Sequence, residues 1–453
     1  MYKFFNSQWI GSALQQNPPP KFFALNKITS DTREVENGDL FVALQGESSD
    51  GHRFVTDAIA KGATAILVRR DFPAPTGVCV FTAADTLEAY RSLARAWRRE
   101  FVLPVVAVAG SAGKTTTKEL IAALLRGKYK NVLFTQSSQN GYQGIPATLL
   151  RIRAEHDAAV IEVGIDECDA MKKHLNLVCP DYGILTSIGE EHLEKLIDLD
   201  TVEKEEGLLF SALATRNGLA IVNLDDARIA RQANLCATLQ KISYSLQDKA
   251  DLYGEVMHSA DCWSLQLKEP YQEKIASPLP GKHNVANLLG AISVAHAIGL
   301  SFEEIHSGLA TFLPPPGRSH LVDWKGVHIL ADTYNANPPS VIAAMETLPN
   351  GTRRYVALGD MLELGTHEEN LHRSLAEAIL KSNISGVFLF GDRMKALTDE
   401  LQKRQYPGLL AHFSQSEVMA QALASTLVAG DALLIKGSRG MRMEKVLEFL
   451  QKL

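Results

Sequence analysis

VVAVAGSAGKTT, residues 105–116, is the stretch that decides the fold of this chain. The apolar run 105–109 predicts a buried strand, and apolar residues then recur at helical spacing between 120 and 125. A glycine-rich turn lies between strand and helix, and a helix that begins at such a turn can hold phosphate oxygens with its backbone N–H groups. Strand, turn and helix in this order indicate a P-loop within an α/β domain.

The side chains of this loop suit an ATP site. Lys114 can reach the terminal phosphates, and the hydroxyl of Thr115 can ligate Mg²⁺. The spacing is GxxGKT instead of GxxxxGKT, because Val108 stands where the usual pattern has its first glycine. The alternative is a glycine-rich turn that binds nothing. The candidate ATP-binding residues of the loop are Gly110, Ser111, Ala112, Gly113, Lys114, Thr115 and Thr116.

Two further strand-like runs end in groups that a magnesium nucleotide site needs. The run 158–162 ends in Glu162, and the run 182–188 leads through Gly-Glu-Glu to His192. If both strands are parallel to the strand before the loop, the three strand ends share one edge of the sheet. Glu162 could then ligate Mg²⁺, with His192 helping at a second site, although a solvated strand end and a structural histidine are the alternatives. The metal candidates are Thr115, Glu162 and His192, and the first catalytic candidates are Lys114, Glu162 and His192.

Length and composition indicate a soluble enzyme of several domains. The 453 residues exceed one ordinary hydrophobic core, and 46% hydrophobic with 22% charged residues is typical of globular proteins. A formal net charge of −6 argues against a nucleic-acid partner. Breaks before Pro104 and at the PPPG cluster predict three domains, 1–102, 103–316 and 317–453.

The order of the predicted elements indicates α/β architecture throughout. The runs 39–44 and 63–68 predict strands around a helix at 54–61, and a second helix is expected from 86 to 100. Beyond residue 317, four strand-like runs each end in a polar turn: HILADTYNANP, YVALGDMLELG, VFLFGDRM and ALLIKGSRG. We therefore expect a small N-terminal α/β domain, a central P-loop ATPase-like domain with a parallel sheet, and a C-terminal Rossmann-like domain.

Cysteine usage and the first residues bear on the compartment. The five cysteines are scattered and form no CxxC pair, which predicts ordinary thiols in a reducing compartment. The N-terminus lacks a basic region followed by a long apolar run, and no apolar stretch reaches membrane-spanning length. These features predict a cytoplasmic protein without membrane insertion, and we expect a monomer.

Sequence blocks spread over nearly the whole chain resemble those of the Mur ligases, the ATP-dependent amide-forming enzymes that build the peptidoglycan stem peptide in the bacterial cytoplasm. The blocks are SDTREVENGDLFVALQGESSDGHRFV, GSAGKTTTKE, LPGKHNVANLLGA, ADTYNANPPS, LGDMLELG and KGSRGMRME. The likeness is greatest to the members that add D-alanyl-D-alanine. It implies ATP and Mg²⁺ as cofactors, and UDP-N-acetylmuramoyl-tripeptide and D-alanyl-D-alanine as substrates.

The resemblance also implies binding roles for three groups of residues. The uridine-diphosphate end of the substrate is implied to lie against Ser30, Asp31, Thr32, Arg33, Gly46, Asp50 and His52. ATP is implied to contact His283, Asn284, Asn287, Arg318 and Asp332 in addition to the glycine loop. The incoming dipeptide and the neighbouring nucleotide are implied to lie near Asn335 and Asn337. Lys436 and Arg439 match the family's KGSR turn, where both could be structural or Arg439 could hold a carboxylate. Turn chemistry, helix capping and ordinary surface charge are the alternatives for single members of these groups.

The family chemistry starts with attack of the substrate's peptide carboxylate on the γ-phosphate of ATP, which gives an acyl phosphate and ADP. The amine of the dipeptide then displaces phosphate to form the amide. Lys114 and Mg²⁺ would stabilise charge on the moving phosphoryl group, and closure of the domains would exclude water.

Three departures from the family pattern lie in the middle of the chain. TVEKEEGLLF places Glu206, with Lys204 two residues earlier, where the family usually carries a carbamylated lysine. We hypothesise that Glu206 substitutes for that group electrostatically and count it as a catalytic candidate; the alternative is a solvated acidic helix face. The family's paired asparagines appear only as Asn140, a candidate for binding the muramyl substrate, and GIDECDAMKK lacks the usual asparagine and Gly-Glu pair.

These departures keep other functions open. Within enzymes, the chain could be a Mur-type ligase with another acceptor or a folylpolyglutamate-type synthetase, although its first blocks and the YNANP turn count against the folate reading. From another class, it could be a nucleotide-binding scaffold that no longer ligates. ATP binding without turnover would distinguish the scaffold.

Overall fold

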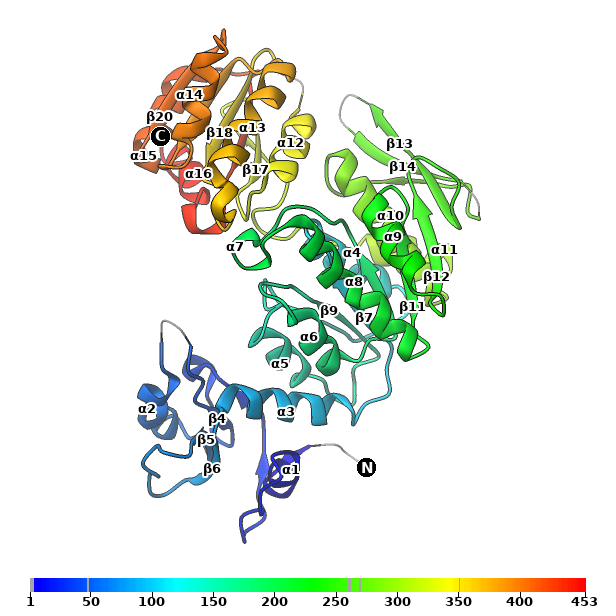
Figure 1. Cartoon of the computed structure of the whole chain (residues 1–453), viewed down its shortest axis with the longest axis vertical. Coiled ribbons are helices and arrows are strands. Elements are labelled where there is room, and N and C mark those ends of the chain that lie inside the picture. The colour runs from blue at the N-terminus through cyan, green and yellow to red at the C-terminus, as the bar shows by residue number, and fades with distance from the viewer. Residues whose placement is uncertain (1–3, 47–48, 260–261, 269, 350) are drawn as a thin grey trace. The chain divides into compact units, whose positions relative to one another are not determined.

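The structure is a computed structural model that describes residues 4–46, 49–259, 262–268, 270–349 and 351–453. The described chain is an α/β protein that divides into two compact units (Figure 1). The first unit comprises residues 1–107, 129–164 and 171–182, and the second comprises 108–128, 165–170 and 183–453. Each unit is described by itself below.

The first unit contains a two-stranded antiparallel pair, β1-β2, and a small parallel sheet, within the α/β domain that the sequence predicts there. Its hydrogen-bonded order is β3-β4-β5-β6, and all neighbouring strands are parallel. Residues of β4, β5 and the helix between them form its core, which includes Phe41, Ala58 and Ile66. The elements are β1 (Phe5–Asn6), α1 (Ser7–Ala13), β2 (Ala24–Leu25), β3 (Ile28–Thr29), η1 (Thr32–Glu34), β4 (Leu40–Val42), η2 (Gly51–Phe54), α2 (Val55–Ala60), β5 (Ala65–Arg69), β6 (Cys79–Ala83) and α3 (Thr86–Arg98).

The central sheet contains the strand that leads into the glycine loop. Its order is β15-β14-β13-β12-β11-β10-β7-β9-β8, and the predicted strands 105–109 and 158–162 are present with those bounds. The expected alternation of strand and helix fails from β12 to β15, where no helix intervenes and β13, β14 and β15 pair antiparallel. The strands are β7 (Val105–Ala109), β8 (Val132–Phe134), β9 (Ala158–Glu162), β10 (Tyr182–Leu185), β11 (Leu219–Asn223), β12 (Gln240–Ser245), β13 (Leu252–Ser259), β14 (Cys262–Leu267) and β15 (Lys274–Ala276).

The last sheet has the order β16-β17-β21-β18-β19-β20, with β16 antiparallel and the others parallel. The four predicted strands are its inner members, and the sequence missed the edge strands β16 and β20, whose residues are mostly half-buried or exposed. Helices α12, α13 and α14 cover one face, and α15 and α16 cover the other (Figure 1). The elements are β16 (His320–Trp324), β17 (Val327–Asp332), α12 (Pro338–Thr347), β18 (Arg354–Gly359), η3 (Gly365–His367), α13 (Glu368–Lys381), β19 (Gly386–Phe390), α14 (Lys395–Lys403), β20 (Leu409–Phe413), α15 (Ser416–Thr426), β21 (Ala432–Lys436), η4 (Arg439–Met441) and α16 (Glu444–Leu450).

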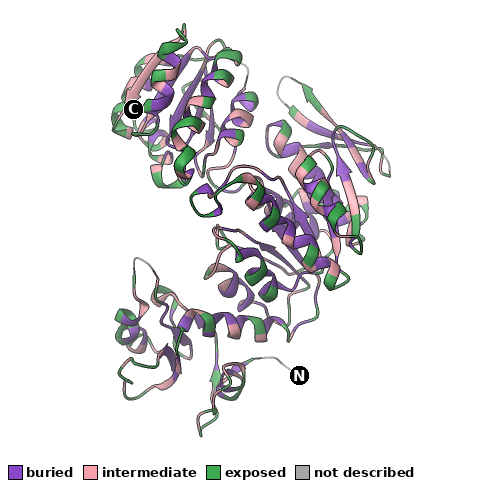
Figure 2. Cartoon of the chain, in the orientation of Figure 1, coloured by how far each residue is buried: buried purple, intermediate pink, exposed green. Residues whose placement is uncertain are grey.

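The remaining helices surround the central strands. The helix after the glycine loop, α4, packs on α10 and α11, and its residues Leu120 to Leu125 are buried or nearly so. Figure 2 shows mainly buried strands and helices with exposed outer faces. These helices are α4 (Lys114–Leu125), α5 (Gly144–Leu149), α6 (Ala170–Val178), α7 (Leu193–Leu196), α8 (Leu199–Thr215), α9 (Ala227–Leu235), α10 (Lys282–Ala297) and α11 (Phe302–Leu309).

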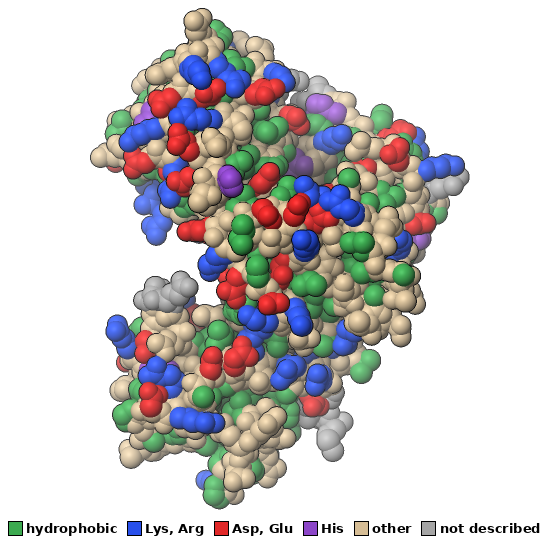
Figure 3. Space-filling view, viewed as in Figure 1, with side chains coloured by type: hydrophobic (Ala, Val, Ile, Leu, Met, Phe, Trp, Pro, Cys, Tyr) green, Lys and Arg blue, Asp and Glu red, His purple; other side chains and the backbone are tan. Residues whose placement is uncertain are grey.

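One face of the molecule carries side chains of both charges. On the face drawn in Figure 3, basic and acidic side chains are interspersed, as a net charge of −6 suggests. Among the residues that the structure describes, no helix is both long and apolar enough to cross a membrane.

Candidate active site

The glycine loop takes the backbone shape that its two glycines permit. Gly110 and Gly113 have φ angles of +115° and +85°, a region that side chains disfavour. A Cβ at Gly110 would lie 2.8 Å from the backbone nitrogen of Thr186. One at Gly113 would lie 2.6 Å from Oδ1 of Asn287. Close packing on both sides therefore requires glycine at both positions, and α4 begins directly after the second glycine.

The loop is fastened to the segment that follows β10. The Ser111 N–H donates to the carbonyl of Ser187 at 2.7 Å, and the Ala112 N–H donates to the Ser187 hydroxyl at 3.1 Å. The Ser111 hydroxyl both donates to the carbonyl of Gly189, at 3.0 Å, and accepts from its N–H, at 2.9 Å. Two N–H groups that could hold phosphate are thus paired within the protein here, and phosphate binding would have to exchange these bonds.

Lys114 is held by a buried carboxylate that the sequence analysis did not single out. Its Nζ lies 3.0 Å from Oε2 of Glu191 and also donates to the carbonyl of Gly110. The two side chains are only 13% and 8% exposed, so the ion pair is largely shielded from solvent. The signal in the sequence was the pair of glutamates directly before His192, at the end of the predicted strand.

Glu206 is fully buried, which excludes the solvated helix face considered for it. Neither carboxylate oxygen meets a hydrogen-bond partner among the described residues. Burial, and then the neighbouring charge of Glu191, raise the pKa of Glu206 well above its usual value, whereas Lys114 lowers it. Glu206 therefore belongs to one buried charge cluster with Lys114 and Glu191, beside the glycine loop. A buried carboxylate with a perturbed pKa next to a phosphate loop is a functional candidate.

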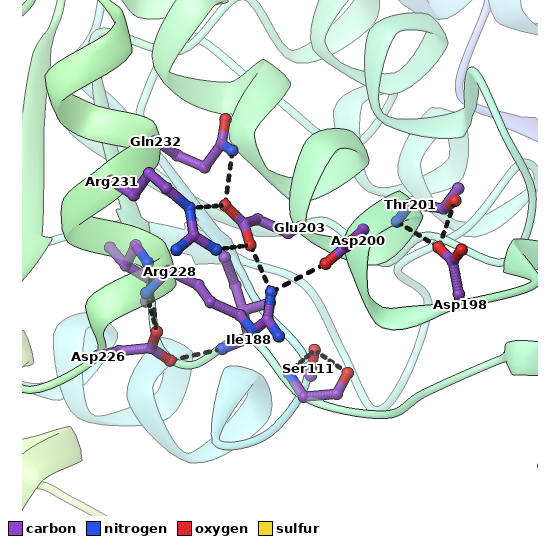
Figure 4. Close-up of polar contacts among 12 residues, drawn as sticks. Ser111, Ile188, Asp198, Asp200, Thr201, Glu203, Asp226, Arg228, Arg231 and Gln232 are labelled. Carbon is purple, nitrogen blue, oxygen red and sulfur yellow. Dashed lines mark hydrogen bonds and ion pairs between the residues drawn. The ribbon is translucent and has the colours of Figure 1, made fainter.

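One turn earlier on α8, Glu203 is fully paired (Figure 4). It accepts hydrogen bonds from Arg228, Arg231 and Gln232, three side chains of α9. These contacts, led by that from Arg231, lower the pKa of Glu203 to about 2. At the start of α9, Asp226 accepts the N–H of Ile188 at 2.8 Å, so the same helix anchors the segment that grips the glycine loop.

Glu162 closes β9 in the first unit and is 1% exposed. The side-chain amide of Asn140 donates to its Oε1 at 2.8 Å, and its own N–H donates to the hydroxyl of Thr135 at 3.0 Å. The structure thus brings two predicted site residues together. A solvated strand end, the alternative for Glu162, does not agree with this burial.

His192 has a φ angle of +48°, and its ring pairs with Glu363, which follows strand β18. Its Nδ1 lies 2.7 Å from Oε2 of Glu363, which leaves Nε2 as the ring nitrogen able to bind a metal. The amide of Asn337 donates to the carbonyl of Glu190 at 3.3 Å, two residues earlier. The segment 189–192 is therefore held from two sides, by the glycine loop and by Asn337 and Glu363.

The HNxxN segment lies at the start of α10. The Asn284 amide donates to the carbonyl of Pro280 at 2.7 Å and to the hydroxyl of Ser319 at 3.2 Å, and Asn287 packs against Gly113 as described. Burial lowers the pKa of His283 to about 4, so this ring is neutral at pH 7. A neutral, partly buried ring one turn before Asn287 on α10 suits contact with an uncharged base.

Arg318 and Asp332 lie in a cluster of charges at the ends of the last sheet. The Arg318 guanidinium lies 4.2 Å from the centre of the Tyr334 ring. Lys436 pairs with Asp332 and donates to the carbonyl of Asn335 at 2.8 Å. Burial alone would raise the pKa of Asp332, but Lys436 lowers it below its usual value. Asn337 caps α12 through Oδ1, and the exposed Arg439 pairs with Glu444 at 3.2 Å.

The residues assigned to the uridine end mostly contact one another. Asp31 accepts the N–H of Arg33 at 2.9 Å and pairs with its guanidinium at 2.6 Å. Asp50 lies 2.7 Å from Nδ1 of His52, whose Nε2 accepts the N–H of Arg69 at 3.0 Å. Both ring nitrogens of His52 are thus used inside the first unit. Turn chemistry accounts for these contacts, and the binding roles of Ser30, Asp31, Thr32, Arg33, Gly46, Asp50 and His52 stay predictions.

The residues present fit magnesium as a partner of a nucleotide. Among the described residues, no three His, Cys, Asp or Glu side chains form a metal cluster. Mg²⁺ commonly uses one or two protein oxygens together with phosphates and water, so a complete protein cage is not expected. Thr115, in the second unit, and Glu162, in the first, are each a buried oxygen donor of that kind. That they share one ion stays a prediction.

The chain is similar to known proteins over nearly its whole length. The family models described as Mur ligase family catalytic domain, Mur ligase middle domain, and Mur ligase glutamate ligase domain match residues 25–123, 108–295 and 317–439. A UDP-N-acetylmuramoyl-tripeptide--D-alanyl-D-alanine ligase from Synechocystis is 34% identical over 433 residues, 94% of this chain and 92% of that protein.

Solved structures give the same result. A crystal structure of MurF from Acinetobacter baumannii matches with a TM-score of 0.89 and 28% identity over 100% of both chains. A structure of UDP-N-acetylmuramoylalanyl-D-glutamyl-2,6-diaminopimelate--D-alanyl-D-alanyl ligase from the same organism matches with a TM-score of 0.83 and 28% identity, over 100% of this chain and 99% of that one.

Proposed function

The chain belongs to the Mur ligase family, and we propose that it is an ATP-dependent, ADP-forming ligase that adds D-alanyl-D-alanine to UDP-N-acetylmuramoyl-tripeptide. The observation that carries this proposal is the glycine loop with Lys114 at the start of α4, in a chain similar over its length to ligases of this name. The reaction belongs to the synthesis of peptidoglycan precursors. We place it in the bacterial cytoplasm, in a monomer.

Three regions divide the work. Residues 1–102 bind the uridine end of the muramyl substrate, residues 103–316 bind ATP, and residues 317–453 bind the incoming dipeptide and close over ATP. The family models, which match three successive parts of the chain, support this division.

The first step activates a carboxylate. An oxygen of the tripeptide's terminal carboxylate attacks the γ-phosphorus of ATP, and the bond from that phosphorus to ADP breaks. The products are an acyl phosphate and ADP. Lys114 stabilises the charge that spreads over the transferred oxygens, and the N–H groups at the start of α4 hold the phosphates.

Nucleotide binding exchanges contacts already present in the protein. Lys114 leaves Glu191 and the Gly110 carbonyl for the terminal phosphates, and the N–H groups of residues 111 and 112 leave Ser187. Each exchange replaces a bond within the protein by a charge-assisted bond to phosphate, which is the stronger kind. The loop therefore keeps its donors paired before ATP arrives.

The oxygen donors Thr115 and Glu162 would hold Mg²⁺, with His192 at a second ion. Bound Mg²⁺ neutralises charge on the phosphates during transfer. Glu363 on Nδ1 of His192 fixes the ring so that Nε2 carries the free lone pair. Glu206 adds a second buried carboxylate near the loop.

The second step forms the amide. The dipeptide's amine nitrogen attacks the acyl carbon, the tetrahedral adduct expels phosphate, and the nitrogen loses a proton. Asn335 and Asn337 lie in the turn that would orient the dipeptide. Because Asn337 also holds the carbonyl of Glu190, the amine side and the phosphate side are linked through one segment.

ADP release by the purified chain tests the proposal. Tripeptide and D-alanyl-D-alanine are added singly and together with ATP and Mg²⁺. The proposal expects rapid release only with both substrates, accompanied by one amide product per ADP. Absence of release in every combination, with ATP still bound, would favour a nucleotide-binding scaffold instead.

A further inference from the structure

A short segment of the first unit, residues 140–143, connects two predicted substrate regions. At one end, Asn140 donates to Glu162 at 2.8 Å. At the other, the side-chain amide of Gln143 lies 3.9 Å from where a Cβ on Gly46 would stand. This inference rests on the proposed function, in which the uridine end of the substrate lies against residues that include Gly46 and Glu162 is a metal ligand. The carboxylate that attacks ATP would then lie on the Glu162 side. The muramyl peptide then has to pass along residues 140–143.

Two cationic side chains converge on Tyr142 in the middle of this segment. The Lys173 Nζ of α6 donates to the Tyr142 hydroxyl at 3.2 Å and lies 5.3 Å from the ring centre. The Arg91 guanidinium of α3 lies 4.9 Å from the same ring centre. Helix α3 packs against α5, which directly follows the segment (Figure 1). Lys173 is exposed, Tyr142 is half-buried and Arg91 is buried. The three side chains therefore extend from the surface into the interior.

The guanidinium of Arg91 has an unused donor. Its side chain is 5% exposed, and its Nε lies 3.4 Å from Oε1 of Glu88. Its Nη1 is buried and has no hydrogen-bond partner among the described residues. An aromatic ring offsets part of the cost of burying a cation, but it does not replace a hydrogen-bond acceptor. The remaining requirement is an anionic acceptor, and a carboxylate is the group that an arginine and a lysine together bind best.

The muramyl peptide offers carboxylates of this kind. A D-glutamyl-diaminopimelyl peptide, as named for the Acinetobacter baumannii relative, keeps one free carboxylate on each of these two residues besides the one that reacts. We propose that Arg91, Tyr142 and Lys173 form a subsite for a non-reacting carboxylate of the peptide. Lys173 and the Tyr142 hydroxyl contact it from the surface, and Arg91 approaches it once the Tyr142 ring shifts.

Calorimetric binding of UDP-muramyl tripeptide to the full chain, without ATP, tests the subsite. With the diaminopimelate tripeptide, Lys173→Met should weaken binding about tenfold, because a charge-assisted hydrogen bond is lost. Tyr142→Phe, which keeps the ring, should weaken binding by a smaller factor. Lys172→Met, an exposed neighbour on the same helix, is the matched control and should bind as wild type does. Replacing the buried Arg91 would also disturb packing, so the test uses Lys173 and Tyr142.

Two further peptides separate the carboxylates. If the difference between Lys173→Met and wild type disappears with the lysine tripeptide, the ligand is the carboxylate of the third residue. If it disappears when D-glutamine replaces D-glutamate, the ligand is the glutamyl carboxylate. Equal binding by Lys173→Met and wild type, or an equal loss with all three peptides, overturns the subsite. A wild-type chain that binds no tripeptide would overturn the proposed function, and the subsite with it.

Discussion

Glu203 and Glu206 lie three residues apart on α8, yet their surroundings shift their pKa values in opposite directions. Glu203 accepts hydrogen bonds from two arginines and a glutamine, and its pKa falls to about 2 (Figure 4). Glu206 is fully buried without a hydrogen-bond partner among the described residues, and its pKa is raised by burial and by Glu191. The same side chain on one helix is thus stabilised at one position and destabilised at the other.

The opposite pKa directions of Glu203 and Glu206 indicate a structural role for the first and a functional role for the second. A carboxylate that is fully paired contributes to folding, because its charge is compensated in the native state. A carboxylate that is fully buried beside a second carboxylate costs stability, and a site that tolerates this cost beside the glycine loop is a functional candidate. Glu203 fixes α8 to α9, and α8 in turn holds Glu206 beside Lys114. The paired residue therefore supports the position of the unpaired one.

The largest expected effect comes from the cation in the Glu206 cluster. Lys114→Ala should lower ADP release with both substrates by a factor of about 1000 or more, because the charge on the transferred phosphoryl group loses its main protein partner. A steady-state assay of ADP measures this. The other buried lysine of α4, Lys118, is not suitable as a control, because its replacement would break the ion pair with Glu119. The exposed Lys128→Ala should keep the wild-type rate, and a Lys114→Ala enzyme as fast as wild type would remove the P-loop assignment.

The paired carboxylate should dominate stability. Glu203→Ala removes the hydrogen bonds that Glu203 accepts from Arg228 and Arg231 and should lower the free energy of unfolding by about 2 kcal/mol. Urea unfolding followed by circular dichroism measures the change. Glu194→Ala, an exposed glutamate on α7, is the control and should differ little from wild type. An unchanged midpoint for Glu203→Ala would mean that the network in Figure 4 is not a structural anchor.

The lowered pKa of Glu203 predicts how the stability of the protein changes with pH. Its folded-state pKa of about 2 lies below the ordinary value of 4.5, so its contribution to stability is complete above pH 4.5 and is lost as the pH falls toward 2. Relative to Glu203→Gln, the wild-type chain should lose about 2 kcal/mol of unfolding free energy between pH 6 and pH 3. Parallel pH profiles for the two proteins would contradict the pairing.

The unpaired carboxylate should show the opposite and smaller effect on stability. Glu206→Gln removes a buried group whose ionisation is disfavoured, so the metal-free, substrate-free protein should gain about 1 kcal/mol in unfolding free energy at pH 8. ADP release should fall by about tenfold, since the charge cluster beside Lys114 changes. A variant that is less stable and fully active would place Glu206 with Glu203, as a structural residue.

The sequence was sufficient for the features that depend on local pattern. The strand 105–109 and the glycine turn follow from an apolar run and from positions that need positive φ, and both are present as predicted. The inner strands of the last sheet could likewise be read from their buried runs. The antiparallel strands β13 to β15 were missed because alternation of strand and helix was assumed across a region of short turns.

Site residues could be proposed from the sequence only where a local pattern, such as a glycine loop or the end of an apolar run, marks them. Lys114 and Glu162 stand at a glycine loop and at a strand end, which is why the sequence offers them as candidates; their roles stay predictions. Glu191 and Glu363 were missed because their significance lies in the contacts with Lys114 and His192. The burial of Glu206 also depends on tertiary packing, since neighbouring charges in the sequence suggest a solvated face. Contacts between distant segments leave no local pattern.

Isotope transfer tests the central claim, that this chain activates a carboxylate with ATP, most directly. Tripeptide labelled with ¹⁸O in its terminal carboxylate is turned over with D-alanyl-D-alanine, and the released phosphate is analysed by mass spectrometry. If the carboxylate attacks the γ-phosphorus, each phosphate carries one labelled oxygen in step with amide formation. Phosphate without label would mean that water attacks the nucleotide, and would contradict the acyl-phosphate ligase proposed for this chain.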